Sequence, residues 1–156
     1  MSHVTCVLAC PHDNSVSIHP LLNNDPYIWL MNELSDPIET LDAVKQLKPQ
    51  VLVLHAGLTR EPLDQFIELL LDKSPGTRVL LLVDQLDDEQ ILKALSGGAR
   101  GYIVEADIPI FLNKAVHAIN LGEAWVPRRM VGHILDHVMF LEKQVLLSGH
   151  DTSLTS

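Results

Sequence analysis

Four polar residues stand where strands are predicted to end, and their side chains could bind a metal ion or move a proton. His12 and Asp13 follow the first apolar segment, His55 ends the third, and Glu105 follows the fifth. Imidazole nitrogens and carboxylate oxygens are common ligands of divalent metals. No HExxH or CxxC spacing accompanies them. The pattern therefore favours the interpretation that His55 fills the pocket and hydrogen-bonds to the backbone or to Glu105. We expect no metal and no other cofactor.

The sequence also lacks the motifs that commonly carry catalysis on alternating strands and helices. It contains no GxGxxG, no Walker A, no GxSxG and no plausible order of serine, histidine and aspartate. The pair Gly97 and Gly98 ends a predicted helix and does not form a phosphate-binding loop. These absences predict a protein that is not an enzyme.

Length, charge and cysteine content limit the class of protein. A chain of 156 residues suits one domain with a sizeable core. Its net charge of −9 argues against direct binding to DNA or RNA, which requires clustered Lys and Arg. Cys6 and Cys10 are predicted on one face of one buried strand, too far apart for an easy disulfide. The N-terminal residues do not show the basic and then apolar segments of a signal peptide, and no apolar run reaches about 18 residues. We therefore expect a cytoplasmic protein without a membrane span.

The elements that would position these residues alternate between strands and helices. Short apolar segments predict buried strands at residues 4–10, 27–31, 51–54, 79–83 and 102–104. Apolar residues at helical spacing predict a short helix after Asn14 and helices that begin near 37, 63, 87 and 109. Pro20 either limits the first of these helices or starts a second turn. Five such units predict an α/β fold with a doubly wound, five-stranded parallel sheet of flavodoxin type. A site in such a sheet lies at the carboxyl ends of the strands.

Two stretches of sequence resemble the receiver domains of NarL/LuxR-family response regulators. They are GARGY at 98–102 and GEAWVPR at 122–128, and the resemblance covers residues 1 to about 128, most weakly before residue 45. It implies the CheY-like (βα)5 form of the fold for a receiver-like domain at 1–127. It also implies the role of an N-terminal signal-receiving and dimerisation domain in a LuxR-type transcriptional regulator of two-component signalling.

The same resemblance identifies a degenerate phosphoacceptor pocket. In the family, the third strand ends in the aspartate that accepts a phosphoryl group, and an acidic pair, a hydroxyl and a lysine surround it. Phosphoryl transfer to a carboxylate needs a divalent cation to neutralise the phosphoryl oxygens. Here the five corresponding positions hold His55, His12, Asp13, Val83 and Glu105. The resemblance therefore implies an atypical receiver that conventional aspartyl phosphorylation does not regulate.

Trp125 and Arg128 allow an alternative function. Biofilm regulators of the VpsT type bind cyclic di-GMP through a motif of Trp, a large apolar residue, Thr or Ser, and Arg at the start of an added helix. Trp125 and Arg128 match this motif in type and place, whereas Val126 and Pro127 depart from it. An arginine can stack on guanine and pair with phosphate. Ordinary NarL-type receivers also carry a tryptophan here that packs the junction, so both interpretations stay open.

The end of the chain predicts an additional helix at 128–147. Its apolar stripe covers only two heptads, so a helix packed on its own domain and a helix packed on a second copy are equally compatible with it. We expect a homodimer, and this stripe is the candidate interface: Val131, Ile134, Val138, Leu141 and Val145.

The last residues, 148–156, predict a flexible linker. Leu154, Thr155 and Ser156 resemble the opening of the helix-turn-helix that follows receivers of this family. The resemblance implies that DNA is contacted only through a domain outside this chain. The input signal is then expected to be a small molecule or a protein.

Overall fold

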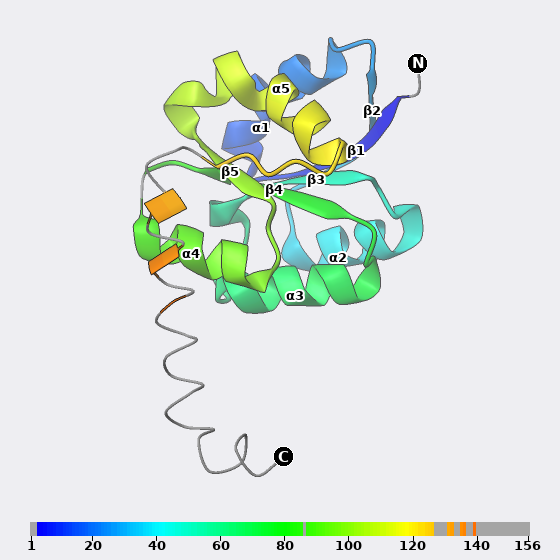
Figure 1. The fold of residues 1–156 in the computed structure, drawn as a ribbon. Helices are drawn as coiled ribbons and strands as arrows, with labels where there is room; N and C mark the ends of the chain where they lie inside the picture. The colour runs from blue at the N-terminus through cyan, green and yellow to red at the C-terminus, as the bar shows by residue number, and fades with distance from the viewer. Residues whose placement is uncertain (1–2, 86, 127–130, 133–134, 137–138, 140–156) are drawn as a thin grey trace. The chain divides into compact units, whose positions relative to one another are not determined.

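The structure is a computed structural model, and it describes residues 3–85, 87–126, 131–132, 135–136 and 139. The chain divides into two compact units, Met1–Trp125 and Val126–Ser156. The first unit holds the named helices and strands (Figure 1). None of the described helices combines the length and apolar character that a membrane span requires.

A five-stranded parallel sheet forms the centre of the first unit. Its strands lie in the order β2-β1-β3-β4-β5, with bounds Val4–Ala9 (β1), Ile28–Leu34 (β2), Val51–His55 (β3), Arg78–Val83 (β4) and Gly101–Val104 (β5). The three central strands are almost fully buried because helices cover both faces. The predicted doubly wound, CheY-like sheet is confirmed.

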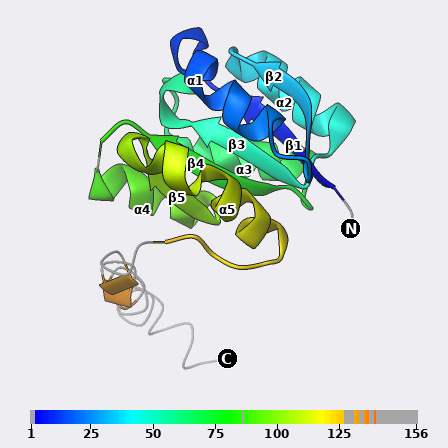
Figure 2. The ribbon, with the colours of Figure 1, turned by 90° about the horizontal axis from the view of Figure 1, so that it is seen from above.

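Five helices cover the two faces of this sheet. α1 and α5 lie on one face and α2, α3 and α4 on the other (Figures 1 and 2). Their bounds are His12–Asn23 (α1), Pro37–Leu47 (α2), Leu63–Lys73 (α3), Asp88–Gly97 (α4) and Ile108–Asn120 (α5). Short 3-10 turns, Ala56–Leu58 and Glu105–Asp107, follow β3 and β5.

Two elements differ from the sequence prediction by more than one residue at an end. The first helix begins at His12 and continues through Pro20, which was expected to limit it or to start a second turn. Pro20 has no backbone N–H to donate within the helix. Burial of Ile18 and Leu22 in the core, on either side of the proline, stabilises the helix despite this missing hydrogen bond. The second strand extends to Leu34, three residues beyond the predicted end at Met31. Its polar final residues concealed this extension.

The helix ends follow local capping chemistry. Asp36 and Asp87 accept hydrogen bonds from the backbone N–H groups of Glu39 and Gln90, at 2.9 and 3.2 Å. Lys48 and Gly98 end α2 and α4 in the left-handed region, with φ of 47° and 119°. These caps set where each connection to the following strand begins.

Both cysteines lie in the core and are free thiols. Burial raises the pKa of the Cys6 thiol to about 12. Burial, together with the charge of Glu33, raises the pKa of the Cys10 thiol to about 12. Neither thiol is therefore ionised near neutral pH, and neither has the character of a reactive cysteine.

The segment after α5 returns to the sheet and pairs beside β5. Trp125 donates its backbone N–H to the Arg100 carbonyl and accepts from the Tyr102 N–H, both at 3.0 Å. The Arg100 guanidinium also donates to the Gly122 carbonyl at 2.8 Å. Gly101 permits this approach, since a Cβ there would overlap the Trp125 carbonyl oxygen. The outer edge of β5 is therefore partly covered.

We predict that Gly101→Ala lowers the free energy of unfolding by about 1–3 kcal/mol, the usual cost of overpacking. The added methyl group must displace the Trp125 backbone and its two hydrogen bonds. Gly76→Ala is the control, because nothing lies within 4 Å of a Cβ built there, and its effect should stay within about 0.5 kcal/mol. Urea denaturation measures both, and equal stability of the two variants would contradict the prediction.

Candidate functional site

The candidate site lies at the carboxyl edge of the sheet. His55 is the last residue of β3, Val83 the last of β4, and Glu105 directly follows β5. His12 is the first residue of α1, three residues beyond Ala9, where β1 ends. Parallel strands deliver these residues to one edge. The strand order reverses between β1 and β3, where doubly wound proteins commonly bind ligands.

His55 is buried, and both of its ring nitrogens are engaged. Nδ1 accepts a hydrogen bond from the Gly57 backbone N–H at 2.9 Å. Nε2 lies 3.0 Å from Oδ1 of Asp84. Because Nδ1 acts as an acceptor, the ring proton must sit on Nε2, which donates it to the carboxylate. The side chain of His55 is 4% exposed and that of Asp84 is 59% exposed, so a buried ring is paired with a largely solvated carboxylate.

Asp84 was missed by the sequence reasoning, which offered backbone or Glu105 as the partners of His55. The backbone partner is the Gly57 N–H, but the carboxylate comes from the residue directly after β4. A signal existed, because a charged residue follows the apolar run of β4 and β4 pairs with β3 in register His55 to Leu82. Glu105 is exposed, and its carboxylate has no hydrogen bond or ion pair with any other described residue, although its backbone carbonyl accepts from the Ile108 N–H.

His12 and Asp13 are not brought to His55 by hydrogen bonds. The His12 Nε2 atom lies 2.9 Å from the Ser35 hydroxyl, at the end of β2. Asp13 is exposed in the first turn of α1. Among the described residues, no group of three His, Cys, Asp or Glu side chains could hold a metal ion.

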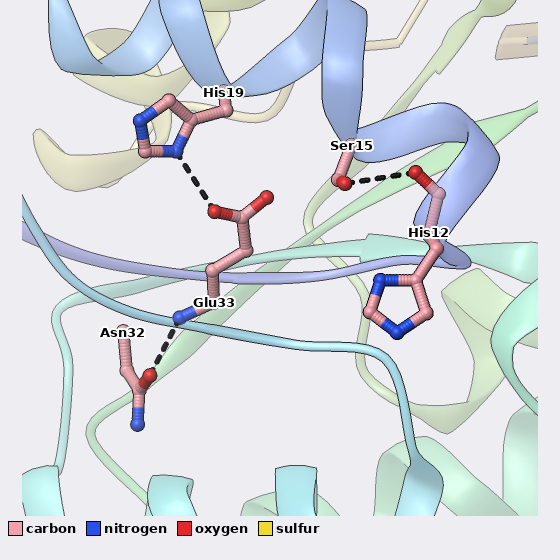
Figure 3. Close-up of polar contacts among 5 residues, drawn as sticks. All are labelled: His12, Ser15, His19, Asn32 and Glu33. Atoms are coloured by element: carbon pink, nitrogen blue, oxygen red, sulfur yellow. Dashed lines mark hydrogen bonds and ion pairs between the residues drawn. The ribbon is translucent and has the colours of Figure 1, made fainter.

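One ion pair ties α1 to the edge strand β2, and local hydrogen bonds lie beside it on each element, as Figure 3 shows. The His19 Nδ1 atom lies 2.8 Å from the Glu33 carboxylate. The Glu33 backbone N–H donates to the Asn32 side chain, and the Ser15 hydroxyl donates to the His12 carbonyl. No spacing in the sequence predicted the pair of His19 and Glu33, because they come together only when α1 packs beside β2.

Val83 makes the end of β4 apolar. It is 1% exposed and pairs with Val104 of β5. Its side chain offers no hydroxyl at the place where the resemblance to receivers implies one. The edge therefore has a histidine at β3, an aliphatic residue at β4 and a carboxylate after β5.

His55 and Glu105 line the same cavity, which has a volume of about 230 Å³. It lies between α1 and the start of α5, and we call it the α1–α5 cavity. Its lining consists of Asn14, Ser17, Ile18, Leu21, His55, Glu105, Ile108 and Pro109. No lysine or arginine is among these lining residues.

Trp125 packs at the junction after α5. It is half-buried against the core cluster, and its ring lies 5.9 Å from the Phe111 ring at an interplanar angle of 47°. Such tilted aromatic pairs are stabilising beyond the area they bury. Arg128, its partner in the cyclic di-GMP interpretation, lies outside the described residues.

The predicted terminal stripe is described only in part. Residues 131–132 and 135–136 are helical, and Val131 is 44% exposed. Leu135 and Met139 are also exposed, at 56% and 65%. Ile134, Val138, Leu141 and Val145 lie outside the described residues, as does the linker at 148–156.

Comparison with known proteins supports the assignment to receivers, although no family model matches the chain. The DNA-binding transcriptional activator DevR/DosR of Mycobacterium tuberculosis is 32% identical over 133 residues, covering 83% of this chain and 60% of the relative. A LuxR-family two-component response regulator from Aurantimonas sp. SI85-9A1 superposes with a TM-score of 0.76 at 19% identity, covering 88% of this chain and 99% of that one.

The chain is a receiver domain of the type carried by NarL/LuxR-family response regulators. It spans about 60% of the length of DevR/DosR. A further match shows the receiver fold within a larger assembly, a structure of two RcsB dimers bound to two parallel DNAs. It has a TM-score of 0.73 at 16% identity and covers 86% of this chain and 69% of that one.

The geometry around His55 predicts its tautomer. A long-range ¹H–¹⁵N spectrum should show the ring proton on Nε2, both in the native protein and in Asp84→Ala, because the Gly57 N–H still occupies Nδ1. Asp84→Ala should lower the free energy of unfolding by about 1 kcal/mol, since it removes one hydrogen bond to a partly solvated charge. Gln85→Ala, at the adjacent exposed position, is the control. A proton on Nδ1 would show that the Gly57 contact does not form.

Proposed function

We propose that this receiver is the signal-receiving and dimerisation domain of a LuxR-type transcriptional regulator that works without aspartyl phosphorylation. The observation that carries the proposal is the buried His55, with both nitrogens engaged, at the end of β3. The domain would act as a signalling module and not as an enzyme. DNA would be bound through a helix-turn-helix that this chain does not contain. The two free, buried cysteines suit a cytoplasmic protein.

The charges at the site oppose a phosphoryl group. A protein-bound phosphoryl group carries about −1.5 to −2 charges at neutral pH. Asp84 contacts His55 directly and Glu105 lines the same cavity, so two carboxylates would face that charge. The cavity lining contains no cationic side chain to offset it. Without a cation site, a hydroxyl at Val83 or a lysine at Glu105, the acyl phosphate would lack each of its usual supports.

His55 itself is a poor phosphoryl acceptor. A histidine attacks phosphorus through a ring nitrogen that presents a free lone pair. The Nδ1 lone pair accepts from Gly57, and Nε2 carries the proton donated to Asp84. Phosphorylation at either nitrogen would break one of these hydrogen bonds inside a buried pocket.

Acetyl phosphate with magnesium should therefore leave the protein unmodified. Intact-mass spectrometry would detect one added phosphoryl group as a mass gain of about 80 Da. A hydroxylamine-labile gain of that size would contradict the proposal. His55→Asp is the informative variant, and it too should stay unmodified, because Val83, Glu105 and Asp84 remain in place. Magnesium-dependent modification of this variant would show that His55 alone prevents the chemistry.

The proposed regulator is also expected to form a homodimer. RcsB, which shares the receiver fold, is found as DNA-bound dimers, and a two-fold DNA site favours two copies of a binding module. The terminal stripe offers a candidate interface: Val131, Ile134, Val138, Leu141 and Val145. A fully buried aliphatic side chain of this kind contributes about 1.5–3 kcal/mol, so the stripe has reason to pack on a partner or on its own domain.

Sedimentation at micromolar concentration should show a dimer that Val138→Glu or Leu141→Glu disrupts, because each places a charge on the stripe. Gln144→Glu adds a charge off the stripe and should leave the dimer intact. Circular dichroism would establish that each variant keeps the fold. A monomeric native protein would contradict dimerisation. A dimer that survives both stripe substitutions would place the interface elsewhere.

Binding of cyclic di-GMP through Trp125 and Arg128 is the alternative function. The Trp125 ring already packs against Phe111 and the core, which favours its role at the junction. Calorimetry with cyclic di-GMP separates the two functions, because saturable heat that Arg128→Ala abolishes would favour the alternative.

A further inference from the structure

The α1–α5 cavity occupies the position at which doubly wound sheets commonly receive a ligand. It lies at the carboxyl edge, bounded by α1 after β1, by His55 at the end of β3 and by the residues after β5. Figure 2 shows α1 and α5 together over this face of the sheet. Its volume of about 230 Å³ is below the usual range for drug-sized ligands. A ligand that fits must therefore be small.

Hydrogen bonds between α1 and α5 hold the cavity walls in place. The Asn113 amide donates to the Leu21 carbonyl at 2.8 Å. Further along, His117 Nε2 lies 3.0 Å from the Asp25 carboxylate. Both bonds join α5 to α1 or to the turn directly after it. Because the walls are already positioned, a ligand would not have to order them, which reduces the cost of binding.

The lining combines an apolar wall with two polar side chains that have no partner among the described residues. Ile18 and Ile108 are buried, and Leu21 is half-buried beside them. The carboxylate of Glu105 and the side-chain amide of Asn14 form no hydrogen bond or ion pair within the described part of the chain. The apolar wall can cover a short hydrocarbon, and the unpaired acceptors can receive its donor group.

The charge of the cavity selects the sign of that ligand. Glu105 contributes a negative charge, and no Lys or Arg belongs to the lining. His55 adds no compensating charge, since its Nδ1 accepts from the Gly57 N–H and the ring carries its single proton on Nε2. The protein as a whole carries a net charge of −9, which also attracts cations and repels anions.

We propose that the α1–α5 cavity binds a small organic cation, an amine or a guanidine with a short apolar body. Its charged group pairs with Glu105 and hydrogen-bonds to Asn14, and its hydrocarbon lies against Ile18, Leu21 and Ile108. This ligand would be the input signal of the receiver, a role that rests on the proposed phosphorylation-independent function. Because His55 lines the cavity and also holds Asp84 after β4, the ligand contacts a residue linked to the β4–α4 connection.

A series of probes with equal size and different charge tests the proposal. The probes are n-butylammonium, n-butanol and butyrate, each titrated to high millimolar concentration at constant ionic strength, with ¹H–¹⁵N spectra as the readout. We expect saturable shifts with n-butylammonium, confined to the cavity lining, weaker shifts with butanol and none there with butyrate. Equal or stronger binding of butyrate, or no saturable shift with n-butylammonium, would overturn the proposal.

Two variants with matched controls locate the site. Glu105→Gln should weaken n-butylammonium about two- to five-fold, the range for one exposed ion pair, whereas Glu123→Gln, outside the lining, should not. Ser17→Phe should block the cavity and abolish the shifts. Val16→Phe, at a neighbouring position that is 77% exposed and outside the lining, should leave them. An unchanged affinity in Glu105→Gln, together with shifts that persist in Ser17→Phe, would place the probe elsewhere and reject the site.

This experiment is independent of the proposed function, because it contains no phosphoryl donor. Binding of n-butylammonium to a protein that acetyl phosphate also modifies would sustain the cavity and reject the proposed function. If n-butylammonium does not bind and acetyl phosphate does not modify the protein, the cavity proposal is rejected and the proposed function is sustained.

Discussion

A buried histidine at the end of the third strand constrains what this receiver can do. A polar ring at that depth is stable only when its nitrogens are hydrogen-bonded. His55 meets this requirement with the Gly57 N–H on one side and the Asp84 carboxylate on the other. These two hydrogen bonds fix the tautomer of the ring. They engage both ring nitrogens, which is the observation behind the proposal that this receiver works without aspartyl phosphorylation.

The charges at the carboxyl edge are consistent with this constraint. A pocket for an acyl phosphate must attract a cation and offset negative charge, and here Glu105 and Asp84 supply negative charge without a lysine or arginine in the cavity lining. Val83 removes the hydroxyl expected at β4. The receiver fold is retained, and the absence of a cationic side chain from the cavity lining is the basis for the proposed preference for cations over anions.

Much of the fold was predictable because parallel sheets leave strong local signals. The central strands are buried on both faces and appear as continuous apolar runs, and Asp36 and Asp87 mark helix starts through their caps. The errors fell where packing overrides local preference. α1 continues through Pro20 because Ile18 and Leu22 are buried. β2 is an edge strand, and its polar residues disguised its length.

The positions of the site residues were also predictable, but their partners were not. Strand ends placed His55, Val83 and Glu105 at one edge, since this depends only on the order of elements. The contacts of His55 with Asp84 and of His12 with Ser35 depend on how connections pack in space. Sequence spacing contains little information about such contacts between residues more than 20 positions apart.

The central claim is that this pocket cannot hold a phosphoryl group, and titration with beryllofluoride and magnesium tests it most directly. Beryllofluoride mimics a phosphoryl group on a carboxylate and binds reversibly, so ¹H–¹⁵N spectra would report any remaining acceptor pocket. We expect no saturable shifts at the amides of His55, Gly57, Asp84 and Glu105. Saturable, magnesium-dependent shifts of these amides would contradict it.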